Sequence, residues 1–278
     1  MQMMTIFQGL SQKFSATKKN NPEQNGPLSG EEITVDFHSH ILPRMDDGSS
    51  DPQESVRMLQ ESFRQGITKM VATPHFYPER EYPDNFLKRR RDSVSALVQA
   101  VDGLSAELKA NLPDIYLGAE VAYFTGIGSS RAMKELSIVG TDYILVEMPF
   151  FKWDRGVIED ILDLKEKQGL NPIIAHIGRY ARCVDEKTFD KLLSNDILIQ
   201  SNAEFFTDRK ASKKALQMLE DGRIHILGSD CHNMGERKPD LGEAMEIITG
   251  HVPASQLEAI NSRGFRILET AVPCYRLS

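Results

Sequence analysis

Histidines and acidic residues recur in this sequence at points where buried strands are expected to end. Imidazole and carboxylate groups together form the usual ligand set of a divalent metal ion in proteins. Gathering them in one place without a cation would be costly, because buried charges need partners. These residue types therefore predict a metal centre rather than a set of independent core histidines. The candidate ligands are His38, His40, Asp46 or Asp47, His75, Glu120, His176, Asp230 and His232.

The spacing within two motifs directs pairs of ligands to the same side of the chain. In the His-Ser-His motif at 38–40, both imidazoles face one side of an extended strand. The same spacing separates Asp230 from His232, with Cys231 directed away between them. So many ligands exceed the needs of one ion, and we expect two or three metals bridged by a carboxylate such as Glu120. Metal ions about 3.5–4 Å apart activate water and offset the charge of a phosphate group.

Two arginines close to candidate ligands extend the expected chemistry to phosphate. Arg179 follows His176 by three residues, and Arg237 follows His232 by five. A guanidinium group binds phosphate oxygens in a bidentate manner. We therefore expect both arginines to bind a substrate phosphate rather than to form surface ion pairs.

The chain also contains the C-x5-R spacing of thiol-dependent tyrosine phosphatases, at Cys231 and Arg237. In those enzymes a cysteine of depressed pKa attacks phosphorus while backbone N–H groups and the arginine hold the oxygens. Here Glu236 would repel phosphate, and the bulky residues of the segment suit such a loop poorly. We interpret this match as a chance one.

Seven short β-rich runs alternate with helical patterns along the chain. Strands separated by helices pair in parallel, and runs that are hydrophobic throughout are typical of a sheet covered on both faces. The lack of a composition break after residue 31 favours one closed β/α barrel, with a doubly wound open sheet as the alternative. In such a barrel the active site lies at the C-terminal ends of the strands. The runs span residues 33–39, 68–75, 115–123, 143–150, 172–178, 197–203 and 224–230.

Capping signals mark the helices between these runs. Asp51 precedes a proline and a glutamate of the first helical turn, and Gly66 ends the same helix. Further helices ended by glycine are expected at about 154–169 and 209–222, and two or three more cover the barrel near the C-terminus. The segment at about 83–112 is predicted to be mostly one helix whose Leu-Lys-Arg-Arg-Arg-Asp run faces solvent.

Composition sets the broad class of the protein. Of its 278 residues 40% are hydrophobic and 26% are charged, as in an ordinary globular protein. The net charge of −7 argues against a general nucleic-acid binder, and no apolar stretch reaches the ~18 residues of a membrane-spanning helix. Three widely spaced cysteines without a CxxC motif fit free thiols in a reducing compartment, so a cytoplasmic location is expected. Residues 1–31 are predicted to be a flexible tail and residues 32–278 the barrel domain.

Five motifs resemble those of a known superfamily in the same order: DFHSHILPRMDDGSSDPQES, VATPH, GAE, IAHIGRY and GSDCHN. They resemble the PHP (polymerase and histidinol phosphatase) superfamily, and more closely its bacterial protein-tyrosine phosphatase branch, the CpsB/CapC family of capsule and exopolysaccharide biosynthesis. The resemblance implies a distorted (β/α)7 barrel of the PHP fold. It also implies hydrolysis of phosphotyrosine by a metal-bridging hydroxide, with a membrane-associated bacterial tyrosine kinase as the substrate protein.

The resemblance further implies a trinuclear site that is commonly filled with manganese, while the ligand types themselves leave Fe²⁺, Zn²⁺ and Mg²⁺ open. Arg179 and Arg237 would hold the substrate phosphate. One departure is Gly178, where members of the family often have glutamate. Carried over by motif, the protein ligands would be His38, His40, Glu120 and Asp230 for one ion, His75, Glu120 and His176 for a second, and Asp47 and His232 for a third.

Two other functions share these features. A histidinol-phosphate phosphatase, or another small-phosphomonoester phosphatase of the superfamily, would use the same metals on a small substrate. A non-enzymatic scaffold would bind a kinase through a metal-stabilised fold, and it would show missing or protein-saturated ligand positions. Every expected ligand type is present and two arginines indicate an anionic substrate, so the sequence favours a tyrosine phosphatase.

Overall fold

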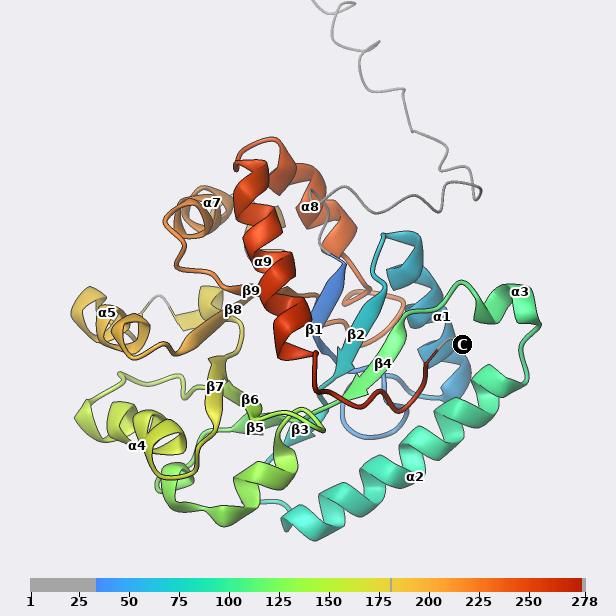
Figure 1. Cartoon of the computed structure of the whole chain (residues 1–278), viewed down its shortest axis with the longest axis horizontal. Helices are drawn as coiled ribbons and strands as arrows, with labels where there is room; N and C mark the ends of the chain where they lie inside the picture. The colour runs from blue at the N-terminus through green and yellow to red at the C-terminus, as the bar shows by residue number, and fades with distance from the viewer. Residues whose placement is uncertain (1–33, 181, 277–278) are drawn as a thin grey trace, which may run out of the picture.

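Seven parallel strand segments form a ring in the structure, a computed structural model that describes residues 34–180 and 182–276 (Figure 1). The expected tail at 1–31 lies outside the described residues. Two of these segments are each split into two short strands, β2 and β3 in one and β4 and β5 in the other. The strands are β1 (Val35–Ser39), β2 (Lys69–Ala72), β3 (His75–Phe76), β4 (Asp114–Leu117), β5 (Glu120–Ala122), β6 (Tyr143–Glu147), β7 (Asn171–Ile174), β8 (Leu198–Asn202) and β9 (Ile226–Gly228).

The ring closes between its first and last strands. The strands pair in parallel in the orders β1–β2–β4 and β3–β5–β6–β7–β8–β9, and Ser39 forms a parallel bridge with Cys231. At this seam the backbone N–H of Asp230 donates to the carbonyl of His38 at 2.7 Å, and that of His40 donates to the carbonyl of Cys231 at 2.9 Å. The predicted distorted (β/α)7 barrel is confirmed, and the open-sheet alternative is wrong.

Gly228 allows β9 to approach β1 closely at this seam. A Cβ atom at position 228 would lie 2.5 Å from the Cβ of His38 and 2.9 Å from the Nε2 of Gln200. A side chain does not fit in this space, so the position requires glycine. The pairing of β1 with β2 also shifts register between Asp36 and Ser39. Strand β1, which is irregular on the side of β2 and closely packed at the seam with β9, therefore carries the first candidate ligand, His38.

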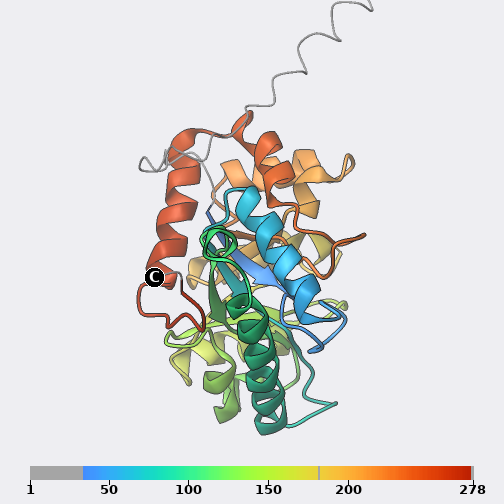
Figure 2. The ribbon, with the colours of Figure 1, turned by 90° about the vertical axis from the view of Figure 1, so that its right-hand side faces the viewer.

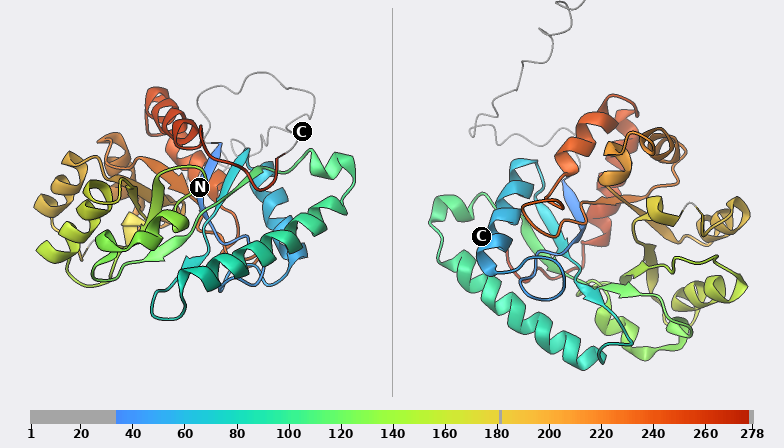
Figure 3. Two further views of the ribbon diagram at one scale, coloured as in Figure 1. Left: turned by 60° about the horizontal axis from the view of Figure 1, so that its bottom comes forward. Right: turned by 180° about the vertical axis from the view of Figure 1, so that it is seen from behind.

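Helices surround the ring, with α9 lying across β1 and β9 (Figures 1 and 3). Figure 2 shows α1 and α2 side by side on one flank of the molecule. None of the helices in the described part of the chain combines the length and hydrophobicity needed to cross a lipid bilayer. They are α1 (Pro52–Arg64), α2 (Pro83–Asp102), α3 (Ala106–Lys109), α4 (Arg155–Glu166), α5 (Glu186–Ser194), α6 (Glu204–Thr207), α7 (Ser212–Glu220), α8 (Leu241–Thr249) and α9 (Ala254–Ile267), with 3-10 turns η1 (Ile127–Ser129), η2 (Arg131–Leu136) and η3 (Ile177–Tyr180).

The helix ends follow the predicted capping signals. The carboxylate of Asp51 accepts hydrogen bonds from the N–H groups of Gln53 and Glu54, both at 2.9 Å, at the start of α1. Asp154 caps α4 through its side chain in the same manner. Gly66, with a left-handed φ of 91°, follows the end of α1, where a residue with a side chain would be strained.

Both faces of the strands are buried, as their continuous hydrophobic runs predict. In β6, Ile144 and Val146 belong to the large apolar cluster that also includes helix residues. Leu145 points the other way and belongs to a smaller cluster with Ile173 of β7 and Leu268 from the end of α9. This alternation is expected of parallel strands covered on both sides.

The charged run of α2 is not a fully solvated face, and this prediction is wrong. Arg90 is only 6% exposed and donates a hydrogen bond to the carbonyl of Gly118 at 2.6 Å. Arg89 donates to the carbonyl of Met45 at 2.8 Å. A guanidinium group on a long apolar stem can reach a backbone acceptor while the stem is buried. These contacts attach α2 to the loops that follow β1 and β4.

Asp240, the residue before α8, should make stability depend on pH. Its Oδ1 is buried without a hydrogen-bond partner among the described residues, and burial together with nearby Asp36 raises the pKa of this carboxyl group to about 7. The unfolded carboxyl group titrates at about 4. The native state therefore keeps a proton that the unfolded state has already lost, and its stability should fall as pH rises from about 4 to about 7.

We expect Asp240→Asn to raise the Tm by about 3 °C or more at pH 8 and by much less at pH 4.5. The amide needs no proton to remain neutral in the buried position. Calorimetry at the two pH values measures the difference, with the exposed Asp221→Asn as the control. An equal shift at both pH values would contradict the role of this carboxyl group.

Candidate metal centre

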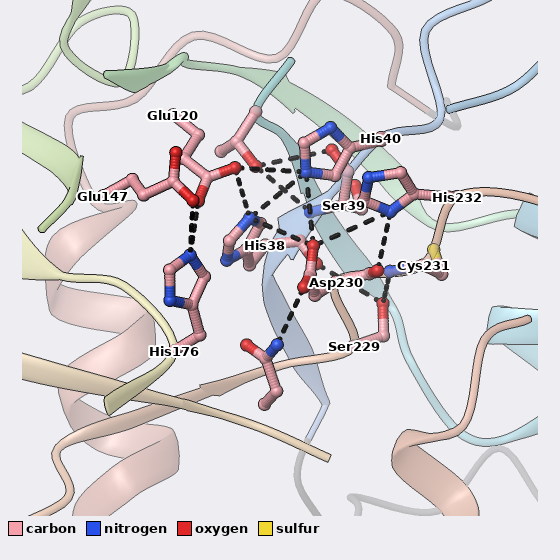
Figure 4. Close-up of polar contacts among 12 residues, drawn as sticks. His38, Ser39, His40, Glu120, Glu147, His176, Ser229, Asp230, Cys231 and His232 are labelled. Carbon is pink, nitrogen blue, oxygen red and sulfur yellow. Dashed lines mark hydrogen bonds and ion pairs between the residues drawn. The ribbon is translucent and has the colours of Figure 1, made fainter. Parts of the chain in front are cut away.

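All of the ligands predicted from the sequence lie at one end of the barrel, where the strands end. Figure 4 shows His38, His40, Glu120, His176, Asp230 and His232 among them. They come from β1, β3, β5 and the loops that follow β1, β7 and β9. Most are buried, and even His75 is only 12% exposed, whereas Asp47 stands on the loop after β1 and is 65% exposed. The structure thus brings together His38, His40, Asp47, His75, Glu120, His176, Asp230 and His232.

Glu120 lies at the centre of this cluster. Its Oε1 is 2.8 Å from Nε2 of His176, and its Oε2 is 3.1 Å from Nε2 of His38. The same Oε2 is 3.0 Å from Nδ1 of His75 and 3.4 Å from Nε2 of His40. Burial alone would raise the pKa of this carboxyl group, but the surrounding imidazoles hold it well below its usual range. One ionised carboxylate therefore faces four imidazoles, which is the arrangement expected of a bridging ligand.

Several buried polar atoms of the cluster lack hydrogen-bond partners in the described part of the chain. They include Nδ1 of His176, and also Oε2 of Glu120 and Nε2 of His232, which lie near ionic partners but form no hydrogen bond of good geometry. The Nε2 atoms of His38 and His40 lie 3.2 Å apart, so at most one of them can donate a hydrogen bond to the other. Buried polar groups are normally paired, and divalent cations are natural partners for imidazole and carboxylate lone pairs.

The donor set therefore fits a centre of several metal ions. Among residues 34–180 and 182–276, donor atoms that lie within 4.8 Å of one another form three groupings, and two of these share Glu120. The groupings are His40, Asp47, His75 and His232; His38, His40 and Glu120; and His75, Glu120 and Glu147.

Both predicted arginines converge on one carboxylate at the edge of the cluster. The Nη2 of Arg179 donates to Oδ2 of Asp230 at 2.6 Å, and the Nη2 of Arg237 lies 2.9 Å from the same oxygen. Asn202 also donates to this oxygen, at 2.8 Å. The Oδ1 of Asp230 faces the cluster, 3.4 Å from Nε2 of His38. The side chains of Arg179 and Arg237 are 34% and 39% exposed, so an incoming anion can reach them.

Two ligands stand on strained backbone. His176 has a φ of 32° and Asp230 a φ of 55°, both in the left-handed region that residues with side chains rarely adopt. The prediction that Asp230 and His232 point the same way assumed that both lie in an extended strand. That assumption is wrong, because β9 ends at Gly228. The common direction itself is confirmed, because Nδ1 of His232 lies 3.7 Å from Oδ1 of Asp230. The left-handed turn at Asp230 produces it.

The structure distinguishes Asp46 from Asp47, which the residue pattern alone did not. The Oδ2 of Asp46 is 2.8 Å from Nδ1 of His40 and accepts the backbone N–H of His75 at 2.8 Å. Burial would raise the pKa of Asp46, but His40 and the backbone hydrogen bonds lower it to about 2. Asp46 thus orients His40 with its Nε2 toward the cluster. Asp47 has its Oδ1 3.4 Å from Nε2 of His232.

Sequence analysis missed two residues of this centre. Glu147, the last residue of β6, has its Oε1 3.5 Å from Nε2 of His176. A carboxylate at the end of a predicted strand, as at Glu120, was the signal that could have revealed it. Gln200 of β8 lies 3.3 Å from Nδ1 of His38 and accepts the backbone N–H of His176 at 2.7 Å. A glutamine within a strand carries no comparable signal.

Cys231 lacks the properties of a catalytic nucleophile. It is fully buried, and burial raises the pKa of its thiol well above the usual range. A nucleophilic cysteine requires a depressed pKa and access to the substrate. The structure therefore supports the interpretation of the C-x5-R spacing as a chance match.

Known proteins are similar to this chain over most of its length. The family described as capsular polysaccharide synthesis, CpsB/CapC, matches residues 34–265, which include every candidate ligand. The chain belongs to the CpsB/CapC family. It is 30% identical to the tyrosine-protein phosphatase YwqE of Bacillus subtilis, over 77% of this chain and 83% of YwqE. It is also 30% identical to the tyrosine-protein phosphatase CpsB of Streptococcus pneumoniae, over 82% of this chain and 96% of CpsB.

A solved structure extends the comparison with the CpsB/CapC family to the fold. It comes from work on YwqE of Bacillus subtilis and CpsB of Streptococcus pneumoniae, described as unique metal-dependent tyrosine phosphatases. The TM-score is 0.72 at 23% identity, with 87% of this chain and 97% of the other covered. The barrel with its closing seam is therefore the fold of this CpsB/CapC member, as the motif resemblance implied.

Proposed function

We propose that this protein is a metal-dependent protein-tyrosine phosphatase that acts on a membrane-associated bacterial tyrosine kinase in the control of capsular polysaccharide synthesis. Its relatives in the CpsB/CapC family bear the name tyrosine-protein phosphatase. The observation that carries the proposal is the convergence of Arg179 and Arg237 on Asp230, at the edge of the histidine and carboxylate cluster. This arrangement offers a phosphate group guanidinium cations on one side and metal cations on the other.

We assign three divalent ions to the centre, with Mn²⁺ as the first candidate and Fe²⁺, Zn²⁺ or Mg²⁺ as alternatives. Bound ions of this kind lower the pKa of a water molecule and offset the charge of a phosphate. Glu147 is an additional candidate ligand because it groups with His75 and Glu120. The assigned ligands are His38, His40, Asp47, His75, Glu120, His176, Asp230 and His232.

The groups of the chain itself bind and orient the phosphate ester. Arg179 and Arg237 exchange their contacts with Asp230 for the phosphoryl oxygens, and they stabilise the charge that these oxygens carry in the transition state. Asp46 keeps the imidazole of His40 in position. A tyrosyl leaving group has a parent pKa near 10, so the chain does not need a strong general acid.

Phosphate release from a phosphotyrosine peptide tests this proposal, with histidinol phosphate assayed alongside. The enzyme is stripped with a chelator and refilled with Mn²⁺, and Cys231→Ser is assayed in parallel. We expect the peptide to be the better substrate, with turnover that disappears on chelation and returns with Mn²⁺. Cys231→Ser should retain wild-type activity, because the buried thiol does not reach the substrate.

Three outcomes would contradict the proposal in different ways. A preference for histidinol phosphate would keep the metal centre but indicate hydrolysis of small phosphomonoesters. Activity that survives chelation and requires Cys231 would indicate thiol chemistry. Metal-dependent binding of the phosphorylated kinase domain without phosphate release would indicate a scaffold.

A further inference from the structure

A cavity of about 140 Å³ opens beside the metal centre. Some of the lining residues belong to the centre or contact Asp230. The others come from η3, from α6 and the residue that follows it, and from the residue before α7. The cavity is therefore continuous with the place where the proposed function puts the phosphate. Its lining includes His176, Gly178, Arg179, Asn202, Phe205 and Ala211.

Gly178 and Phe205 touch and form an apolar wall of this cavity. A Cβ atom at position 178 would lie 2.7 Å from Cγ and 3.2 Å from Cβ of Phe205. Any side chain at 178 would therefore displace the phenyl ring. The ring is half-buried, and its neighbour Phe206 is fully buried in the core. Glycine at 178 thus allows α6 to present an aromatic side chain to the cavity.

We propose that this cavity binds the aryl ring of the phosphotyrosine substrate, with Phe205 in contact with that ring. The inference rests on the proposed function. Arg179 lines both the cavity and the centre, so a phosphate held by this guanidinium places the attached ring at the cavity. The volume is suitable, because an apolar protein cavity of about 150 Å³ accommodates benzene. Aromatic rings in offset or edge-to-face contact also attract each other beyond their burial.

The charges around the cavity determine which part of the ester enters it. Glu204 and Asp208 also line the cavity, and their carboxylates would repel a phosphate dianion. An uncharged ring meets no such repulsion. Arg179, where the cavity meets the centre, and Arg237 supply the cationic partners of the phosphate. The charge distribution therefore favours the ring in the cavity and the phosphate at the centre over the reverse orientation.

Inhibition constants of phenylphosphonate and methylphosphonate test this inference, because the two inhibitors share a headgroup and differ in the ring. We expect the Mn²⁺-loaded wild type to bind phenylphosphonate about tenfold more tightly. Phe205→Ala should reduce this preference to about threefold or less, with the affinity for methylphosphonate and the metal content unchanged. Phe205→Tyr should retain the preference, and Gly178→Ala should weaken it by displacing the ring.

Phe265→Ala is the matched control, since Phe265 is 43% exposed on α9. An unchanged preference in Phe205→Ala, or an equal loss of affinity for both phosphonates, would overturn the assignment of the cavity while leaving the phosphatase proposal intact. Failure of the wild type to hydrolyse aryl phosphates would overturn the proposed function instead. Phosphonate affinities measured by calorimetry on the same variants would then still decide whether Phe205 contacts the ring.

Discussion

Glu120→Gln should abolish turnover and remove metal from the centre. The carboxylate of Glu120 faces four imidazoles and belongs to two of the three donor groupings in the described residues. Glutamine has the same shape, but its amide is neutral and its NH₂ group donates hydrogen bonds rather than binding a cation. We expect kcat/KM for a phosphotyrosine peptide to fall by at least about 10³-fold, equivalent to about 4 kcal/mol of transition-state stabilisation.

Elemental analysis of the purified variant, together with phosphate release, measures both effects. Glu159→Gln on α4 is the matched control, because its side chain is 50% exposed and pairs with Arg155 one turn away on the helix surface. Circular dichroism shows whether the barrel is still folded. A folded Glu120→Gln protein with full metal content and full activity would remove Glu120 from the proposed centre.

Replacing both Arg179 and Arg237 with alanine should reduce activity nearly as much as Glu120→Gln does, but without loss of metal from the centre. Both side chains point to Oδ2 of Asp230, and both remain exposed enough to meet a substrate. Removing one preorganised donor to a developing oxyanion costs about 10²–10³-fold in kcat. We expect kcat/KM to fall about 10²-fold in each single variant. The fall in the double variant should be smaller than the product of the two single effects, because both groups bind the same phosphate.

Measurements of kcat/KM and metal content on the single and double variants separate binding of phosphate from binding of metal. Lysine at either position should retain part of the activity, since it keeps the charge but loses bidentate contact. Arg155→Ala, at a side chain that is 88% exposed, is the control. Wild-type activity in the double variant would contradict the role of the arginines, and loss of metal together with activity would show that they support the centre rather than bind substrate.

The order and type of the elements were predictable because short-range signals decide them. All seven predicted strand runs occur, and the helix after β1 begins at Asp51 and ends before Gly66 as its capping residues indicate. The gathering of the ligands followed from topology, since the carboxyl ends of parallel barrel strands meet at one end. Local chemistry and connectivity therefore indicated the type of fold and most of the residues of the site.

Contacts between distant segments were not predictable from local signals. The run around Arg90 gave no sign that one of its arginines is buried on the carbonyl of Gly118. The backbone at Asp230 was expected to be extended, yet it is left-handed just beyond the seam with β1. Glu147 was not recognised because an acidic residue at a strand end becomes a candidate ligand only when its neighbours across the barrel are known.

Sequence alone indicates an α/β chain, with a β/α barrel favoured over an open sheet, that carries histidine, carboxylate and arginine groups at the ends of its strands. Only the tertiary structure decides which of them meet, because the distances across the barrel depend on how it closes at Gly228. The loop after β1 directs Asp46 to His40 and leaves Asp47 exposed. It is likewise only in three dimensions that Phe205 meets the glycine in η3 and forms a wall beside the centre.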